Sequence, residues 1–215
     1  MSLTLIYDLL KASAETLYMT ATSTFFAVLL GLPLGTLLFC SKAIKPHPFL
    51  YRSISALINF SRSIPFIILL VALIPLTRLL VGTSIGINAA IVPLTLGAIP
   101  FFARLADNVY QNLPSGLIET GFSMGSSTWQ MIRHLLLPEA FPAMIQAITI
   151  TAITLINYSA MAGTVGGGGL GDLAIRYGYQ RFNPLIMIAT VVILVVFVQL
   201  LQMSGDKLAK HFTHR

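Results

Sequence analysis

Charged residues are scarce in this chain. Asp, Glu, Lys and Arg make up 9% of its 215 residues, against roughly a quarter of the residues in soluble domains. A soluble fold of this length could not cover its surface with so few charges, so we exclude a soluble globular domain. Hydrophobic residues account for 56% of the chain. The bilayer is therefore predicted to be the solvent for most of it.

Cysteine and acidic residues are also few. Cys40 is the single cysteine, which excludes an internal disulfide. The histidines show no paired metal-ligand spacing, so we predict neither a metal site nor another cofactor. All seven acids are expected outside the long apolar segments; they are Asp8, Glu15, Asp107, Glu119, Glu139, Asp172 and Asp206. Ion-coupled transporters usually carry acids or histidines inside membrane helices, so this distribution disfavours that class.

Five apolar segments remain, each near the 20 residues that a helix needs to cross about 30 Å of hydrocarbon. We expect spans over 17–39, 59–80, 85–103, 143–163 and 184–203. The chain is predicted to be an all-α integral membrane protein forming one domain over 1–215. Leu3, Ile6, Leu10 and Ala14 follow helical spacing, which favours a short interfacial helix before the first span. Arg62 interrupts the second span, and we interpret it as a residue near the inner helix end that snorkels to the interface.

The net charge of +6 is interpreted as a membrane-topology signal that meets anionic lipid, rather than as a nucleic-acid surface. Nine cations fall on one side of the predicted spans: Lys42, Lys45, Arg52, Arg62, Arg104, Arg133, Lys207, Lys210 and Arg215. The other side receives Lys11, Arg78, Arg176 and Arg181. Because the richer side is cytoplasmic by the positive-inside rule, the N-terminus is predicted outside and the C-terminus in the cytoplasm. That orientation requires an odd number of spans.

The segment 104–142 is the longest stretch between spans, and helix signals lie within it. Ser127 followed by Gln130 fits a capping box, which predicts a short helix over 128–137. Its face of Trp129, Ile132, Leu135 and Leu136 is apolar. Ordered helices on the cytoplasmic side favour a docking site for a partner; the alternative is a helix that lies on the lipid headgroups.

This segment also carries the most informative motif in the chain. Glu119-Thr120-Gly121, Gly125 and Leu135-Leu136-Leu137-Pro138 resemble the EAA loop of binding-protein-dependent ABC importer permeases. Thr120 and Gly121 stand in place of the two usual alanines, and Leu135 in place of the usual isoleucine. The resemblance implies a loop that couples the permease to its ATPase, and the candidate coupling residues are Glu119, Gly121, Gly125, Trp129, Ile132, Leu137 and Pro138.

Spacing also suggests physical roles for two of these residues. A glycine at Gly125 lets the chain take positive φ between two short helices, and lets a partner approach the backbone closely. Glu119 can cap a helix start or pair with a cation of the partner.

The resemblance extends over nearly the whole chain. The segments 62–66, 81–86, 158–161 and 169–171 are similar to methionine importer permeases. That family implies an inner-membrane homodimer of five-helix subunits, a cytoplasmic ABC ATPase dimer and an external substrate-binding lipoprotein. ATP hydrolysis is then expected in the partner, and this chain is not itself an enzyme. D- or L-methionine, or a related amino acid, is the implied substrate.

The fourth expected span carries a polar stripe. Gln146, Thr151, Thr154, Asn157, Tyr158 and Met161 fall within roughly 140° at 100° per residue. We expect this stripe to face the translocation pathway at the dimer axis, with Met161 narrowing it. The alternative is that Thr and Asn bind neighbouring helices.

Gly166, Gly168 and Gly171 form a G-x-G-x-x-G pattern. A nucleotide site needs a strand before this pattern, and an expected membrane helix precedes it here, so we predict an external turn or gate. Two other function classes remain open. An ion-coupled secondary amino-acid transporter is the main alternative, and a membrane scaffold is the other.

Overall fold

The computed structural model describes residues 3–213, with side chains from residue 5 onward. This part of the chain is helical and contains no strand. Four helical segments are long and apolar enough to cross a membrane, and a bent pair of shorter helices is a fifth candidate span. The prediction of an all-α integral membrane protein with about five spans is therefore confirmed.

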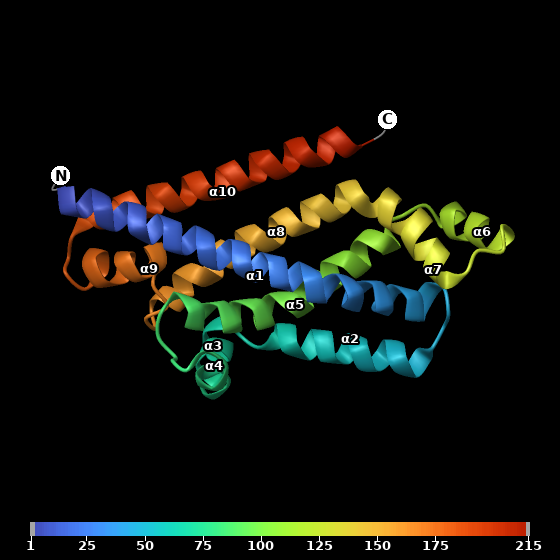
Figure 1. Cartoon of the computed structure of the whole chain (residues 1–215), viewed down its shortest axis with the longest axis horizontal. Helices are drawn as coiled ribbons and strands as arrows, with labels where there is room; N and C mark the ends of the chain where they lie inside the picture. Colours follow the sequence, from blue (N-terminus) through green and yellow to red (C-terminus); the bar gives the residue numbers. More distant parts are fainter. Residues whose placement is uncertain (1–2, 214–215) are drawn as a thin grey trace.

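The long helices lie roughly side by side along the longest axis of the molecule (Figure 1). They are α1 (Leu3–Ala43), α5 (Ile87–Gln111), α8 (Leu137–Gly163) and α10 (Pro184–Phe212). Shorter helices join them: α2 (Pro48–Ser63), α3 (Phe66–Ala72), α4 (Ile74–Val81), α6 (Ser115–Ser123), α7 (Thr128–Gln130), η1 (Met131–Leu136), α9 (Gly169–Leu173) and η2 (Ala174–Tyr179). The two segments η1 and η2 are π-helical.

The first helix is longer than expected. It runs without a break from Leu3 to Ala43, a rise of about 60 Å at 1.5 Å per residue, so it must project beyond the hydrocarbon. A separate interfacial helix before residue 17 is not formed, and that prediction was wrong. The stretch from Ala14 to Leu17 contains neither glycine nor proline, so nothing there ends the helix.

The second expected span, 59–80, is not one helix. The structure instead forms α2 from Pro48 to Ser63, turns by 97°, and continues as α3 from Phe66. Pro65 explains the break, because it offers no N–H to the preceding turn and its ring excludes the residue before it from helical conformation. Ile64 accordingly takes an extended conformation, with φ −82° and ψ 122°.

The expected short helix over 128–137 and the expected span over 143–163 are continuous. Together they form a helical run from Thr128 to Gly163. Pro138 lies in the first turn of α8, directly after the π-helical segment. A proline ring clashes with the carbonyl four residues earlier in an α-helix, and the wider π turn relieves that clash. Pro138 therefore shapes the helix instead of ending it.

Helix α5 is the centre of the bundle, and α1, α2 and α8 pack around it. One apolar cluster surrounds Phe102, Tyr110 and Leu136, and a second surrounds Met19, Leu94 and Leu155. Helix α10 differs, because only 11% of its most apolar window is buried. It packs on α8 and leaves most of its surface to lipid.

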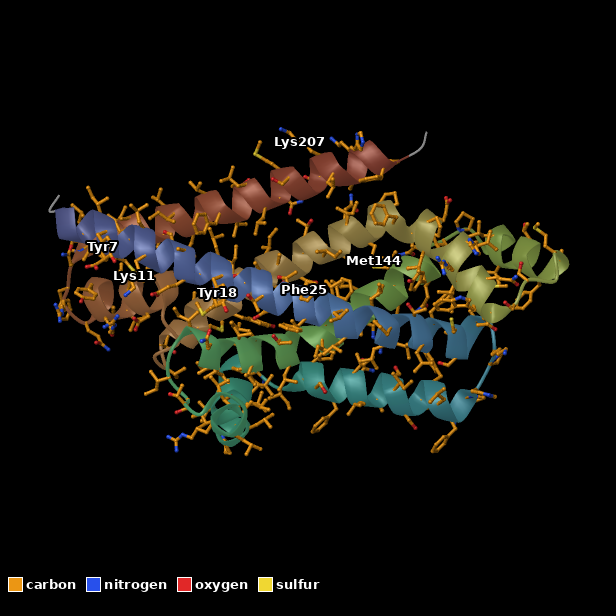
Figure 2. All side chains as sticks on the ribbon, viewed as in Figure 1. Tyr7, Lys11, Tyr18, Phe25, Met144 and Lys207 are labelled. Atoms are coloured by element: carbon orange, nitrogen blue, oxygen red, sulfur yellow. The ribbon has the colours of Figure 1, made fainter. Side chains whose placement is uncertain are left out.

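The two ends of the molecule carry different elements. Helices α6 and α7 lie at one end, and α9 lies at the other, beside the N-terminus (Figure 1). Lys11 lies near the N-terminal end of α1, and Lys207 lies toward the C-terminal end of α10 (Figure 2). Arg215 lies outside the described residues.

Candidate functional site

The loop between α6 and α7 is a tight turn built on glycine. Gly125 has φ +69°, and its N–H donates to the carbonyl of Phe122 at 2.9 Å. A Cβ added at Gly125 would meet nothing within 4 Å. Glycine is therefore needed here for its backbone conformation, and the positive φ agrees with the prediction from the sequence. The outer surface of the turn is open.

The capping box predicted for the next helix is present. The Ser127 hydroxyl accepts from the N–H of Gln130 at 3.3 Å, and the Gln130 side chain accepts from the N–H of Ser127 at 2.9 Å. Gly121 holds α6 against η1, since a Cβ there would lie 2.9 Å from Met131 Cε and 3.0 Å from Leu135 Cδ1. Helices α6 and α7 and the turn between them, called the α6–α7 hairpin below, thus form a defined unit and not a loose linker.

Glu119 is exposed on α6. It lies in the middle of that helix and not at a helix start, so it caps no helix in the described part of the chain. Its carboxylate forms no hydrogen bond or ion pair within residues 5–213. Of the two roles expected for Glu119, pairing with a cation of a partner is the one this position permits.

The predicted apolar anchor divides between two faces. Trp129 is 66% exposed, while Ile132 and Leu137 pack inward against the cluster around Phe102 and Tyr110. Trp129 also lines a groove of about 400 Å³ with Leu37 and other residues of α1. Ile132 and Leu137 line the same groove and are partly buried, so they offer a partner less surface than Trp129 does. Ile132 is turned toward the bundle because η1 packs there through the fully buried Met131 and Leu136.

The polar stripe on α8 is largely on the surface of the protomer. Gln146 and Asn157 are exposed, Met161 is 45% exposed, and Thr154 is partly exposed. Thr151 departs from the expectation, because it is fully buried and donates to the carbonyl of Ala147 at 2.8 Å. It lies at the far edge of the predicted arc, where α8 already meets its own bundle.

An exposed polar stripe on a membrane helix cannot face lipid without cost, because hydrocarbon offers no hydrogen-bond partners. The opposite side of α8 holds Leu155 and Ile156, which are buried in the protomer. The stripe must therefore meet water or another protein surface. This is the arrangement that a pathway between two protomers needs.

Tyr158 lies at the edge of the stripe. Its ring stacks on Phe66 with centroids 4.3 Å apart and planes inclined by 3°.

Arg62 lies in the last turn of α2, and its guanidinium carbon is 5.9 Å from the ring centroid of Phe101. The sequence interpretation placed Arg62 near the inner end of its helix. That interpretation was wrong, because α2 begins at Pro48 and Arg62 lies at the other end of this helix.

Comparison with known proteins identifies the family. Residues 27–215 match the family described as "Binding-protein-dependent transport system inner membrane component". The chain belongs to this family. It is 51% identical to the probable D-methionine transport system permease protein MetI of Vibrio cholerae, over 96% of this chain and 93% of that protein. It is 50% identical to the D-methionine transport system permease protein MetI of Salmonella typhi over the full length of both.

Two solved structures share the fold of this chain. A chain of the inward-facing MetNI methionine ABC transporter is 49% identical and superposes with a TM-score of 0.98 over 100% of both chains. A chain of an amino acid ABC transporter crystallised with histidines shares the fold, with a TM-score of 0.71 over 95% of this chain and 92% of that one at 20% identity. This inner-membrane component is therefore a multi-pass membrane protein, as predicted.

This protein also contains a polar network that the sequence analysis did not predict. Arg104 donates to the Asp107 carboxylate at 3.1 Å and to Ser55 and Asn59 of α2 at 2.9 and 2.8 Å. Gln111 donates to the same carboxylate at 2.8 Å. All seven acids lie outside the spans predicted from the sequence, but α5 continues beyond residue 103 and carries the fully buried Asp107. The spacing of Arg and Asp three apart, directly after an apolar run, was the available signal.

At the opposite end, the glycine-rich pattern forms a turn before α9. Gly166, Gly168 and Gly169 all take positive φ. The Glu15 carboxylate accepts from the N–H of Gly169, and the Thr16 hydroxyl accepts from the N–H of Leu170, both at 2.9 Å. These two hydrogen bonds anchor the glycine-rich turn to α1. The sequence analysis did not predict these contacts of Glu15 and Thr16, although the two residues directly precede the first apolar run.

The same end carries an ion pair on η2 and α9. Arg176 donates to both oxygens of Asp172, and this hydrogen bonding raises the pKa of Arg176 above its usual value. Within the described residues, no three His, Cys, Asp or Glu side chains come together as a metal site would require.

Proposed function

We propose that this chain is the permease subunit of an ATP-driven ABC importer for methionine or a related amino acid. The observation that carries the proposal is the full-length similarity to a MetNI chain, at 49% identity and a TM-score of 0.98. The names of the Vibrio and Salmonella relatives support the substrate class. ATP hydrolysis then belongs to a separate cytoplasmic ATPase dimer, and an external binding protein delivers the substrate.

The α6–α7 hairpin is the proposed coupling element. Its tip offers an open backbone at Gly125 and an exposed carboxylate at Glu119, which suit insertion into a cleft of the ATPase. Gly121 and the Ser127 cap fix the hairpin to η1 and hence to α8. Since η1 continues directly into α8, a movement of the hairpin reaches the helix that carries the polar stripe. Docking there also places this end, and the C-terminal end of α10, in the cytoplasm.

A homodimer supplies the missing wall of the pathway. One protomer exposes Gln146, Asn157 and Met161 along α8, and a two-fold axis would bring the same residues of a second copy opposite them. The polar groups would then line a route between the protomers, and Met161 would narrow it. The apolar surface of α10 would remain toward lipid.

Transport by the reconstituted complex tests the proposal. The permease is purified with a candidate ATPase and placed in proteoliposomes with the external binding protein. We expect uptake of radiolabelled methionine that requires ATP and the binding protein and persists when a proton ionophore collapses the proton gradient. Uptake that the ionophore abolishes, but that an ATPase-inactive partner leaves intact, would instead establish the ion-coupled secondary transporter.

Thiol accessibility tests the pathway. Single cysteines at Thr154, Asn157 and Met161, in a chain whose Cys40 is replaced by alanine, should react with a hydrophilic maleimide, and their rates should change when ATP is added. Val192→Cys is the control, because Val192 is exposed on the apolar α10 and should stay unreactive in lipid. Equal protection of the three stripe positions in every transport state would exclude this pathway.

A further inference from the structure

The break between α2 and α3 leaves a polar helix end on the surface of the protomer, where Arg62 and Ser63 are exposed. Pro65 supplies no N–H, so carbonyl oxygens in the last turn of α2 have no helical donor after them. The aligned peptide dipoles give this helix end a partial negative charge. Interrupted helices in transporters place such ends beside bound ligands at membrane depth.

A small cavity lies at this helix end. It has a volume of about 180 Å³, and its walls include Ser61 and Arg62 of α2, Phe66 of α3, Gly97 and Phe101 of α5, and Tyr158 of α8. Gly97 and Phe101 fall in the middle of α5, which runs from Ile87 to Gln111. The cavity is therefore within the membrane-spanning region and away from both ends of α5.

Arg62 supplies a cation that the protomer leaves uncompensated. Arg104 is neutralised by the buried Asp107, whereas Arg62 contacts no carboxylate within residues 5–213. Its recorded partner is the ring of Phe101, at 5.9 Å. An unpaired cation at membrane depth is costly and marks a functional position. It has the chemistry to receive an anionic group that arrives with a ligand.

The cavity adjoins the polar stripe. Tyr158 is three residues from Met161, which places it about 60° around α8 at 100° per residue. Its ring faces the cavity and stacks on Phe66 at a centroid distance of 4.3 Å. A ligand that moves along the stripe would therefore pass the mouth of this cavity.

We propose that the Arg62 cavity is a binding site for the transported α-amino acid within the permease itself, an inference that rests on the proposed function. Arg62 receives the carboxylate through charge-assisted hydrogen bonds. The carbonyl end of α2 and the aromatic faces receive the ammonium group. Phe66 and Tyr158 contact an apolar or thioether side chain. The volume of about 180 Å³ is below the roughly 300–1,000 Å³ of drug-sized sites and suits a single amino acid.

Protection of a reporter thiol tests this site without the binding protein. Ser61→Cys, in a chain carrying Cys40→Ala, is labelled with a hydrophilic maleimide in the complete permease–ATPase complex. Methionine should slow the labelling. Methioninamide, in which a neutral amide replaces the carboxylate, should require a concentration about 10- to 100-fold higher, which is the loss expected when a charged hydrogen-bond partner is removed.

Substitutions at Arg62 locate the origin of that preference. Arg62→Gln should reduce the discrimination between methionine and methioninamide to about two-fold or less, and Arg62→Lys should restore part of it, because a lysine is a point charge without the planar fork of arginine. Arg52→Gln is the matched control: Arg52 lies on the same helix, is exposed, and is not among the cavity walls. It should retain the full discrimination.

Two failures can be told apart. A wild-type complex that performs no ATP-driven methionine uptake refutes the proposed function. Normal uptake with a Ser61→Cys thiol that neither compound protects, or that both protect equally, overturns the site alone. If Arg62→Gln fails to assemble, the comparison of the two compounds in the chain with native Arg62 still decides the question. Retained discrimination in an assembled Arg62→Gln complex would also refute the assignment.

Discussion

Replacing Gly125 by glutamine should release the ATPase and stop transport, while the helices still insert into the membrane. Gly125 has φ +69°, where a non-glycine residue costs about 1–2 kcal/mol. An added Cβ would meet nothing within 4 Å inside the protomer, so the helical bundle leaves open space at this position. The glutamine side chain would project where the partner must approach. We expect at least a ten-fold loss of ATPase co-purification and no ATP-driven uptake in proteoliposomes.

Gly82→Gln is the matched control. Gly82 also has positive φ, +82°, and open space around its Cβ position, but it follows α4, far along the chain from the α6–α7 hairpin. Its substitution carries the same backbone cost without altering the hairpin. Glu119→Ala should weaken coupling less than Gly125→Gln, because an exposed ion pair contributes about 0–1 kcal/mol. A Gly125→Gln protein that keeps both its ATPase and its transport would exclude this hairpin as the coupling element.

Replacing Arg104 by methionine should destabilise the protomer by about 3–5 kcal/mol, the cost of leaving a buried charge without its partner. Asp107 is fully buried and Arg104 is 16% exposed. One carboxylate oxygen of Asp107 already has no hydrogen-bond partner in the described part of the chain. Without Arg104, this carboxylate would keep Gln111 as its recorded donor. Reversible unfolding of the detergent-solubilised protein measures the loss.

A double substitution separates the two parts of this effect. Arg104→Met with Asp107→Leu removes both charges and should recover much of the lost stability, since apolar replacements of buried ion pairs are often neutral. Arg133→Met is the control, because Arg133 is exposed on η1 and should cost less than about 1 kcal/mol. If Arg104→Met were no more destabilising than Arg133→Met, the hydrogen bonds of Arg104 would not be the tie between α5 and α2.

Several features followed from local sequence. The shortage of charges and the long apolar runs were sufficient to predict a membrane-embedded helical fold, because the bilayer imposes the same requirement on every residue within it. The capping box at Ser127 and the positive φ at Gly125 were predicted correctly, since neighbouring residues determine both. The EAA-like motif led to the family for a similar reason: its residues lie within one short segment.

Other features depended on how helices meet. The helical period placed Thr151 on the polar stripe, but α8 buries it within its own bundle. Trp129 and Ile132 were expected on one apolar face, yet Trp129 is exposed and Ile132 is partly buried against the bundle. Periodicity gives the direction of a side chain relative to its helix axis. It does not say which direction faces protein, lipid or water, and this is decided by the neighbouring helices.

The sequence by itself determined the class of the protein, its long apolar segments, its EAA-like motif and its family. Only the tertiary structure decided that Arg62 lies at the far end of α2, beside Phe101 and the stacked Phe66–Tyr158 pair. It also decided that Arg104 joins α5 to Ser55 and Asn59. The physical reason is that these groups come from separate helices. Their proximity depends on the 97° bend after α2 and on the packing around α5, which no single segment encodes.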